Sequence, residues 1–326
     1  MAVDRGIQLT DVQLRALDKR LMQIYQDALQ QALARERAAL SKLAAFDVLQ
    51  YPSMTYEQIQ AQRLIYLNSA IRETDLVNHI AEEIAHGGTL AALDIQRTMG
   101  DAFGINLDWG RYTVDRQSGV FLNWPMLDRR TIEIIMRNGQ SPFTQIAFNK
   151  LGQDVIITQR LQNELIQAML LGESRAQLVK RIQNVTGQSL SQARRVAQTE
   201  VVRVQSQARF EAGNEAIDMG IGMQKQWISR MDSHVRDTHA AQTGEIVDYD
   251  EAFSNGLMYP GDENGEPAET INCRCVLKDM VKNVPDSVKR YREQMQQNYG
   301  FDRWRELRAA GGPVDKYGYY EDEEGA

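Results

Sequence analysis

The residue types best suited to binding a soft metal ion gather in the C-terminal third of the chain. Cys273 and Cys275 are separated by one residue, and His239, His234 and Asp232 precede them. On a strand, residues i and i+2 point to the same face, so the two sulfur atoms would lie side by side. Two thiolates on one face can hold one zinc ion, and His239 with either Asp232 or His234 would complete a tetrahedron. The sequence therefore predicts a zinc site, with Asp232, His239, Cys273 and Cys275 as its candidate ligands.

The same residues allow other interpretations. Two reduced cysteines can pack as small apolar side chains without a ligand, whereas a disulfide between residues i and i+2 would be strained. If a bound metal ion kept an open position, His239 and Asp232 could activate water, and the site would be a metal-dependent phosphodiesterase or nuclease. Arg274, between the cysteines, would point to the opposite face of the strand, where it could pair with a loop carboxylate.

A second candidate site is a basic segment at residues 174–209. It holds seven arginine and lysine residues and one acid, Glu200, in a chain whose net charge is −7. Such a segment could contact DNA phosphates or an acidic protein surface. Residues 227–285 contain eleven acidic and five basic residues, so an internal electrostatic match is the alternative. The candidate DNA or portal contacts are Arg194, Arg195, Arg203 and Arg209.

The elements that must position these residues are mostly helices. Thr10 and Gln13 fit a capping box, and an apolar stripe with heptad-like spacing follows it toward Phe46. This long amphipathic helix needs an intramolecular or intermolecular partner to cover its stripe. The stripe consists of Leu14, Leu17, Leu21, Ile24, Ala28, Leu33 and Leu40.

Glycine, proline and capping residues predict where the helices break. We expect Thr55 and Gln58 to open a second helix, residues 104–127 to form a loop or short hairpin, and Ser189 to cap the last long helix. The predicted breaks in the helical pattern are Gly87, Gly88, Gly172 and Gly187.

After Gly220 the pattern changes to short strands, at residues 225–229, 245–247 and 273–277, around a loop rich in glycine, proline and acidic residues. The fold class is therefore mainly α, with a small α+β C-terminal module and an elongated helical N-terminal region. The predicted parts are a helical region at 1–125, a helical middle region at 126–220, the α+β core module at 221–285, and a helix with an acidic tail at 286–326.

The composition and the motifs that are missing from the sequence argue against several classes of protein. Of the 326 residues, 43% are hydrophobic and 25% charged, which is ordinary for a globular chain. The chain has no apolar run of about 18 residues that would span a membrane, and its start does not resemble a signal peptide. Two cysteines are too few for a secreted disulfide scaffold. A Gly-x-Ser-x-Gly elbow, a Walker A loop and a His-Glu-x-x-His helix are all missing from the sequence.

The C-terminal third resembles a known family in the order of its motifs. Its members in this sequence are Ala197-Gln198-Thr199-Glu200, Trp227, Asp232-Ser-His-Val-Arg236 with His239, Phe253, Pro260-Gly261-Asp262 and the closing Asn272-Cys273-Arg274-Cys275. As an ordered combination they are similar to the phage Mu protein F-like family of head morphogenesis proteins, also called minor head proteins. The resemblance covers about residues 170–281 and leaves the N-terminal half outside.

The resemblance implies a tailed-phage or prophage protein that associates with the portal and other head proteins. Such a protein would enter the virion head during assembly in the host cytoplasm, and some relatives are linked to packaging or release of double-stranded DNA. Few residues follow Cys275, which disfavours an added toxin-like enzyme domain, so we expect a structural protein with zinc as its one candidate cofactor. Besides the four candidate ligands, the motif residues with an expected structural role are Trp227, Arg236, Asn272 and Arg274.

Overall fold

The computed structural model describes residues 4–44, 76–125, 142–171, 175–232, 234–285 and 299–310, with a few isolated positions between them. The chain divides into two compact units. Unit 1 consists of residues 1–15, 96–140 and 197–326, and unit 2 consists of residues 16–95 and 141–196. Within the described ranges, no helix is both long enough and apolar enough to cross a lipid bilayer.

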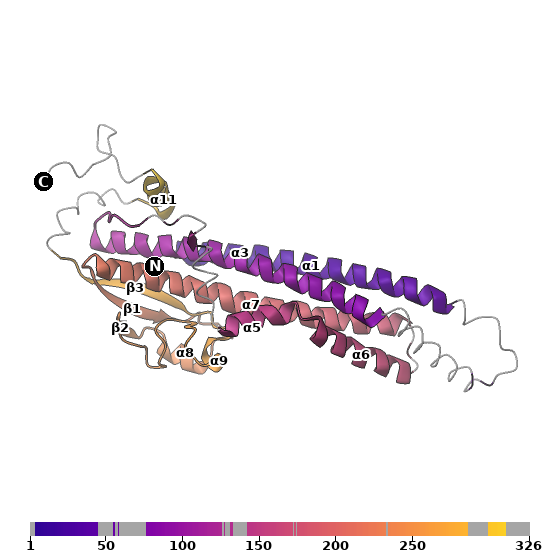
Figure 1. Cartoon of the computed structure of the whole chain (residues 1–326). Coiled ribbons are helices and arrows are strands. Elements are labelled where there is room, and N and C mark those ends of the chain that lie inside the picture. Colours follow the sequence, from indigo (N-terminus) through magenta and orange to yellow (C-terminus); the bar gives the residue numbers. More distant parts are fainter. Residues whose placement is uncertain are drawn as a thin grey trace. The chain divides into compact units, whose positions relative to one another are not determined.

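Helices dominate both units, and a small antiparallel sheet belongs to unit 1, so the predicted mainly α fold with an α+β module is confirmed (Figure 1). The sequence predicts four consecutive parts, at 1–125, 126–220, 221–285 and 286–326. The two units are not consecutive in this way, because α1, α3 and α7 each contribute residues to both of them, and the four-part division stays a prediction. The helices are α1 (Arg5–Ala44), α3 (Leu76–Ser118), α5 (Pro142–Leu151), α6 (Asp154–Leu170), α7 (Arg175–Asp218), α8 (Asp237–Gln242), α9 (Pro267–Thr270) and α11 (Phe301–Ala309).

Helix α1 begins one turn earlier than its sequence predicts. Asp4 caps it, because its Oδ1 accepts a hydrogen bond of 2.9 Å from the Ile7 N–H. The predicted cap, Thr10, lies inside the helix, where its hydroxyl donates to the Gly6 carbonyl and accepts a bond of 2.8 Å from Asn106 Nδ2. The capping-box prediction at Thr10 was therefore wrong, and this side chain instead links α1 to α3 within unit 1.

The second predicted capping box is confirmed. The Gln58 N–H donates to Thr55 Oγ1 at 3.3 Å, and the Thr55 N–H donates to Gln58 Oε1 at 3.0 Å. The rest of the helix predicted between these residues and Leu76 lies outside the described residues.

The apolar stripe of α1 is covered inside unit 2. Leu17 and Leu21 are each 1% exposed, and Ala28 is also buried. Helix α3 approaches this stripe at Gly87, where an added Cβ would lie 3.1 Å from Ala28 Cβ. The side chain of Leu40 lies outside the described residues. An intramolecular partner therefore covers the stripe at Leu17, Leu21 and Ala28, whereas Leu14, Ile24 and Leu33 stay partly exposed.

Gly87 and Gly88 lie inside α3, so the prediction that they end a helix was wrong. They permit close packing instead, since a Cβ on Gly88 would lie 1.7 Å from the Leu151 carbonyl oxygen. The loop predicted at 104–127 is wrong for its first part and is present only after residue 118. Helix α3 runs through that segment to Ser118, and Gly119 follows at a φ of 75°.

Helix α7 also continues through two predicted interruptions. Gly187 and Ser189 both lie within it, and the Ser189 hydroxyl donates to the carbonyl of Val185, so neither the break nor the cap is present. The break predicted near Gly172 does separate α6 from α7. The final helix is described from Phe301, and the acidic tail lies outside the described residues.

The sheet of unit 1 has three strands in the order β2-β1-β3, all antiparallel. They are β1 (Gly222–Ile228), β2 (Ile246–Asp248) and β3 (Val276–Asn283). Gln226 of β1 lies opposite Ile246 on one side and Lys278 on the other. The first two predicted strands are confirmed with small shifts, whereas the third begins at Val276, after both cysteines.

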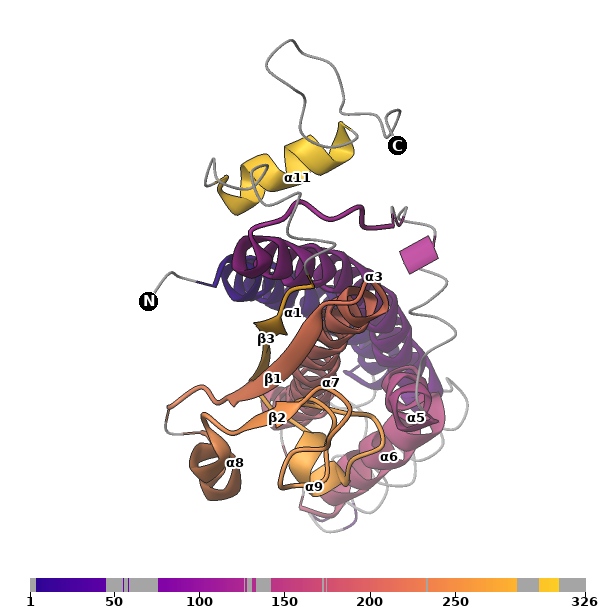
Figure 2. The same cartoon turned by 90° about the vertical axis from the view of Figure 1, so that its left-hand side faces the viewer.

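The buried face of β1 packs on aromatic side chains and on the C-terminal part of α7. Figures 1 and 2 show the sheet beside this part of α7. Lys225 is fully buried, with its Nζ 2.9 Å from the Tyr249 carbonyl oxygen and 4.8 Å from the centre of the Phe210 ring. Desolvation lowers the pKa of Lys225 to about 8. The face that holds Lys225 continues to Trp227, which carries the core to the candidate site.

Candidate metal centre

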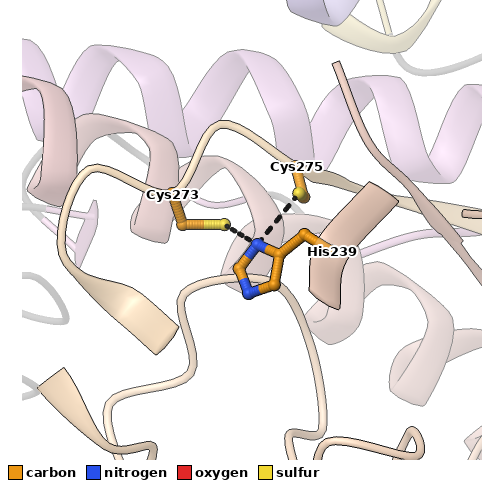
Figure 3. A group of neighbouring side chains, drawn as sticks. All are labelled: His239, Cys273 and Cys275. Carbon is orange, nitrogen blue, oxygen red and sulfur yellow. Dashed lines mark hydrogen bonds between the residues drawn. The ribbon is translucent and has the colours of Figure 1, made fainter. Parts of the chain in front are cut away.

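His239, Cys273 and Cys275 converge in unit 1 (Figure 3). His239 lies on the short helix α8, and its Nδ1 is 3.4 Å from Cys275 Sγ and 3.7 Å from Cys273 Sγ. The donor atoms of all three residues lie within 4.8 Å of one another. Each side chain is at most 2% exposed. The structure therefore brings three of the four predicted ligands together in a buried cluster.

The two cysteines share an orientation because of a turn, not because of a strand. Asn272 has a φ of 57°, in the left-handed region that asparagine tolerates. Its N–H donates to Thr199 Oγ1 at 3.0 Å, which ties the turn to α7. Arg236 donates to the carbonyl of Ile271 in the same turn. The expected structural role of Asn272 and Arg236 thus corresponds to holding the cysteine segment in place.

Asp232 does not belong to the cluster. Its carboxylate accepts hydrogen bonds from the Arg274 guanidinium and the His234 N–H, and these bonds lower the pKa of Asp232. Arg274 therefore pairs with a loop carboxylate, as its position between the cysteines predicted. The structure does not bring Asp232, the predicted fourth ligand, to the cluster, because its Oδ1 accepts both of these hydrogen bonds outside it.

A different carboxylate contacts the histidine. Glu269 Oε2 lies 2.7 Å from His239 Nε2, so the imidazole is held from the side opposite the sulfur atoms. Glu269 belongs to α9, four residues before Cys273. Nothing in its spacing distinguishes Glu269 in the sequence from the other acids of the loop, so the sequence alone does not predict this contact.

Trp227 and Ser229 support the cluster from β1 and its end. The Trp227 ring meets the His239 ring edge to face at 5.3 Å, and its Nε1 donates to Ser229 Oγ at 3.1 Å. Ser229 Oγ donates in turn to the His239 carbonyl and lies 3.4 Å from Cys275 Sγ. Trp227 is completely buried, which fits the structural role that its motif position suggested.

The cluster is built to hold a thiolate beside a histidine. Hydrogen bonds from Cys273 and His239 lower the pKa of Cys275. The pKa of Cys273 is raised, because Cys273 donates a hydrogen bond to Cys275 and is buried. The hydrogen bonds to Cys275 and Glu269 raise the pKa of His239. Arg236 and Arg274 line a small pocket beside the cluster, together with the exposed His234. Two buried sulfur atoms that converge on one imidazole nitrogen form a donor set that could hold a metal ion.

The four arginines of the basic segment have different environments. Arg209 is 1% exposed and Arg203 5% exposed, so their burial contradicts the prediction that they contact DNA or another protein. Arg203 pairs with Glu200 at 3.0 Å. Arg194 pairs with Asp18 at 2.5 Å and stays partly exposed, as does Arg195. Arg203 also lies 3.8 Å from Glu263, which belongs to residues 227–285, and Arg209 pairs with Asp4 at 2.7 Å. The internal match of charges is therefore present at Arg194, Arg203 and Arg209.

Comparison with known proteins assigns this part of the chain to a family. Residues 159–278 match the family described as phage Mu protein F like protein, and they contain His239 and both cysteines. This segment is therefore similar to the phage Mu protein F-like family, and the resemblance inferred from the motifs is confirmed.

Three curated relatives are similar at 26–28% identity. They are the NAD(+)–arginine ADP-ribosyltransferase EFV of Enterococcus faecalis (28% over 202 residues, 59% of this chain and 40% of the relative), the minor head protein GP7 of Bacillus phage SPP1 (27% over 165 residues, 49% and 53%) and an uncharacterized protein of Haemophilus influenzae (26% over 151 residues, 44% and 31%). The chain thus spans about half or less of the length of these relatives. No solved structure matches it.

Proposed function

We propose that this chain is a phage minor head protein that acts in capsid assembly, is carried in the virion head and associates with the portal. The observation that supports the proposal most directly is the family match over residues 159–278, together with the likeness to the minor head protein GP7. The fold is consistent with a structural role, because its long helices bury their apolar faces against one another and its basic side chains form internal ion pairs.

The experiment that tests the proposal measures whether purified phage heads contain this chain. Heads are isolated from the phage or induced prophage that encodes the chain, and mass spectrometry measures the copies of the chain relative to the portal and major capsid proteins. We expect a few copies per head, cross-links to the portal in intact heads, and defective particles when the gene is deleted. Heads without the chain, and normal particle yield from the deletion, would refute the proposal.

Substitutions in the apolar stripe do not test the association with the portal. If the stripe faced another head protein instead of a helix of the same chain, aspartate at Leu17 and Leu21 would abolish incorporation into heads. Both side chains are buried in unit 2, and two buried carboxylates would unfold that unit before any interface could be assessed. Cross-linking of the unaltered chain is the sharper experiment.

For DNA, we infer a minor role for the basic segment. Two of its four candidate contacts are buried and a third is paired with Asp18. We expect the purified chain to bind duplex DNA weakly, and Arg194→Ala with Arg195→Ala to change that binding less than twofold. Tight binding that falls steeply with salt concentration, and that this double variant abolishes, would instead identify α7 as a DNA contact.

The alternative function, a metal-dependent phosphodiesterase that uses His239 and Asp232, loses support. That mechanism needs the Asp232 carboxylate beside the metal ligands, whereas Arg274 and the His234 N–H hold it. We expect no cleavage of duplex DNA above background, with or without added divalent metal ions. Cleavage that disappears in His239→Ala but persists in Arg194→Ala would restore this alternative.

The relative named as an ADP-ribosyltransferase suggests a second enzymatic candidate. The match covers 40% of that protein, which leaves most of its length outside the shared region. We infer that the shared region is the head-protein part and that the transferase activity belongs to the remainder. Incubation of this chain with labelled NAD+ and an arginine-rich acceptor should therefore give no labelled product. Labelling above the level of a heat-denatured control would contradict this inference.

A further inference from the structure

The buried cluster of His239, Cys273 and Cys275 has the spacing of a metal site. A tetrahedral zinc ion with Zn–S distances of about 2.3 Å and Zn–N distances of about 2.0–2.1 Å separates a sulfur from a nitrogen ligand by about 3.6 Å. The two observed separations from His239 Nδ1 are 3.4 Å and 3.7 Å. Side chains from segments 34 and 36 residues apart thus reach the spacing that one shared ion requires.

Two sulfur atoms converge on one nitrogen atom, and hydrogen bonding does not account for both contacts. Nδ1 of an imidazole carries either one proton or one lone pair, so it makes one good hydrogen bond. Both cysteines are buried free thiols, and although Cys275 Sγ also lies 3.4 Å from Ser229 Oγ, the two sulfur atoms still share one Nδ1. A metal ion placed between the three atoms would bind all of them at once, with both sulfurs as thiolates.

The surroundings of His239 select the state that binds a metal ion. Glu269 Oε2 lies 2.7 Å from Nε2 and can accept its proton in a hydrogen bond, which leaves the lone pair on Nδ1, facing the sulfur atoms (Figure 3). A carboxylate behind a histidine is the usual second shell of a zinc ligand, where it fixes the ring and raises its basicity. The Trp227 ring packs against the imidazole edge to face, with the ring centres 5.3 Å apart.

We propose that His239 Nδ1, Cys273 Sγ and Cys275 Sγ bind one zinc ion, with Glu269 as the outer carboxylate and a solvent molecule as the fourth ligand. Among the described residues, no further histidine, cysteine or carboxylate belongs to the cluster as a fourth ligand. The pocket beside it is lined by His234, Arg236 and Arg274, which leaves room for solvent on that side. Two thiolates and one imidazole are soft ligands that favour zinc over magnesium or calcium.

The ion would fasten α8 to the turn that leads into β3. The segment between His239 and Cys275 contains β2 and a long loop with little regular structure. A link across it restricts the unfolded chain and therefore stabilises the fold of this part of unit 1. This inference does not depend on the proposed role in phage heads, because it concerns metal content and not assembly.

The first experiment measures zinc in the full chain, purified without chelators. We expect about one equivalent per chain by elemental analysis, lost on prolonged chelation and regained on addition of Zn2+. Replacement by Co2+ should give the visible absorption of a tetrahedral site and a sulfur-to-cobalt charge-transfer band. Less than about a tenth of an equivalent, with no Co2+ spectrum after reconstitution, would overturn the proposal.

Variants then identify the ligands. Cys273→Ser, Cys275→Ser and His239→Ala should each lose the Co2+ spectrum, whereas Asp232→Asn and His234→Ala, which alter neighbours outside the cluster, should keep it. Retention of the spectrum in His239→Ala, or its loss in Asp232→Asn, would refute the ligand set. Circular dichroism shows whether each variant is folded.

Glu269→Gln keeps the test decisive if a ligand variant does not fold. It leaves the three ligands in place, and it should weaken zinc binding 10–100-fold in a chelator competition because the imidazole loses its outer carboxylate. An unchanged affinity for zinc would refute the proposed role of Glu269 as the carboxylate that holds His239. Fast alkylation of Cys275 at the same rate with and without added Zn2+ would overturn the proposal in favour of a reactive thiolate.

Discussion

Replacing Arg209 with methionine should destabilise unit 1 strongly, because this buried guanidinium joins α1, α3, α7 and β3. Its Nε and Nη2 donate to Asn106 Oδ1 at 3.1 and 3.0 Å, and its Nη1 and Nη2 donate to the Asp4 carboxylate at 2.7 and 2.8 Å. Nη1 also donates to the Leu277 carbonyl at 3.2 Å. Arg209→Met keeps the length of the side chain and removes every donor.

The expected loss follows from the partners that remain. Removing one member of a buried ion pair costs about 3–5 kcal/mol, because the other charge stays desolvated. Asp4 is partly exposed, which reduces this cost, but Asn106 Oδ1 and the Leu277 carbonyl are each left without a donor, at about 1–3 kcal/mol per buried group. We therefore expect the free energy of unfolding to fall by about 4 kcal/mol.

The assay is urea unfolding followed by tryptophan fluorescence. All four tryptophans, Trp109, Trp124, Trp227 and Trp304, belong to unit 1, so the signal reports this unit selectively. The matched control is Arg303→Met, also in unit 1, whose exposed ion pair with Glu306 should contribute less than about 0.5 kcal/mol. Equal stability of Arg209→Met and the control, with weakened DNA binding, would refute the structural role and restore the prediction of a DNA contact.

Two further predictions concern pH and packing. Burial raises the pKa of Asp115 to about 7, although Trp124 and Trp304 donate hydrogen bonds to it. Between about pH 4 and 7 the folded state then holds a proton that the unfolded state has lost. As the pH rises through this range, the free energy of unfolding of the unaltered chain, measured in urea relative to Asp115→Asn, should fall by about 1.4 kcal/mol per pH unit. A difference that does not change with pH would show that the carboxylate stays ionised. Gly88→Ala should destabilise unit 2 by about 1–3 kcal/mol because its Cβ overlaps the Leu151 carbonyl, whereas Gly187→Ala, with open space around its Cβ, should stabilise it by up to about 1 kcal/mol. Hydrogen exchange in α3 and α7 measures both changes, and equal effects of the two substitutions would contradict the packing argument.

The sequence by itself determined the class of the fold, the position of the small sheet and the residues of the cluster. Alternation of apolar and polar residues located β1 and β2, and the Cys-x-Cys segment with His239 identified three residues that meet in space. These features are readable because each depends on the chemistry or the period of a few residues. The ordered motifs also sufficed to identify the family over residues 159–278.

Only the tertiary structure decided how these residues are used. Gly88 and Gly187 are alike in sequence, yet one permits a close contact with a neighbouring helix and the other faces open space. Glu269 rather than Asp232 contacts His239, because the fold brings α9 against α8 while Arg274 holds Asp232. In each case the outcome depends on which group from a distant segment lies opposite, and local sequence carries no record of that neighbour.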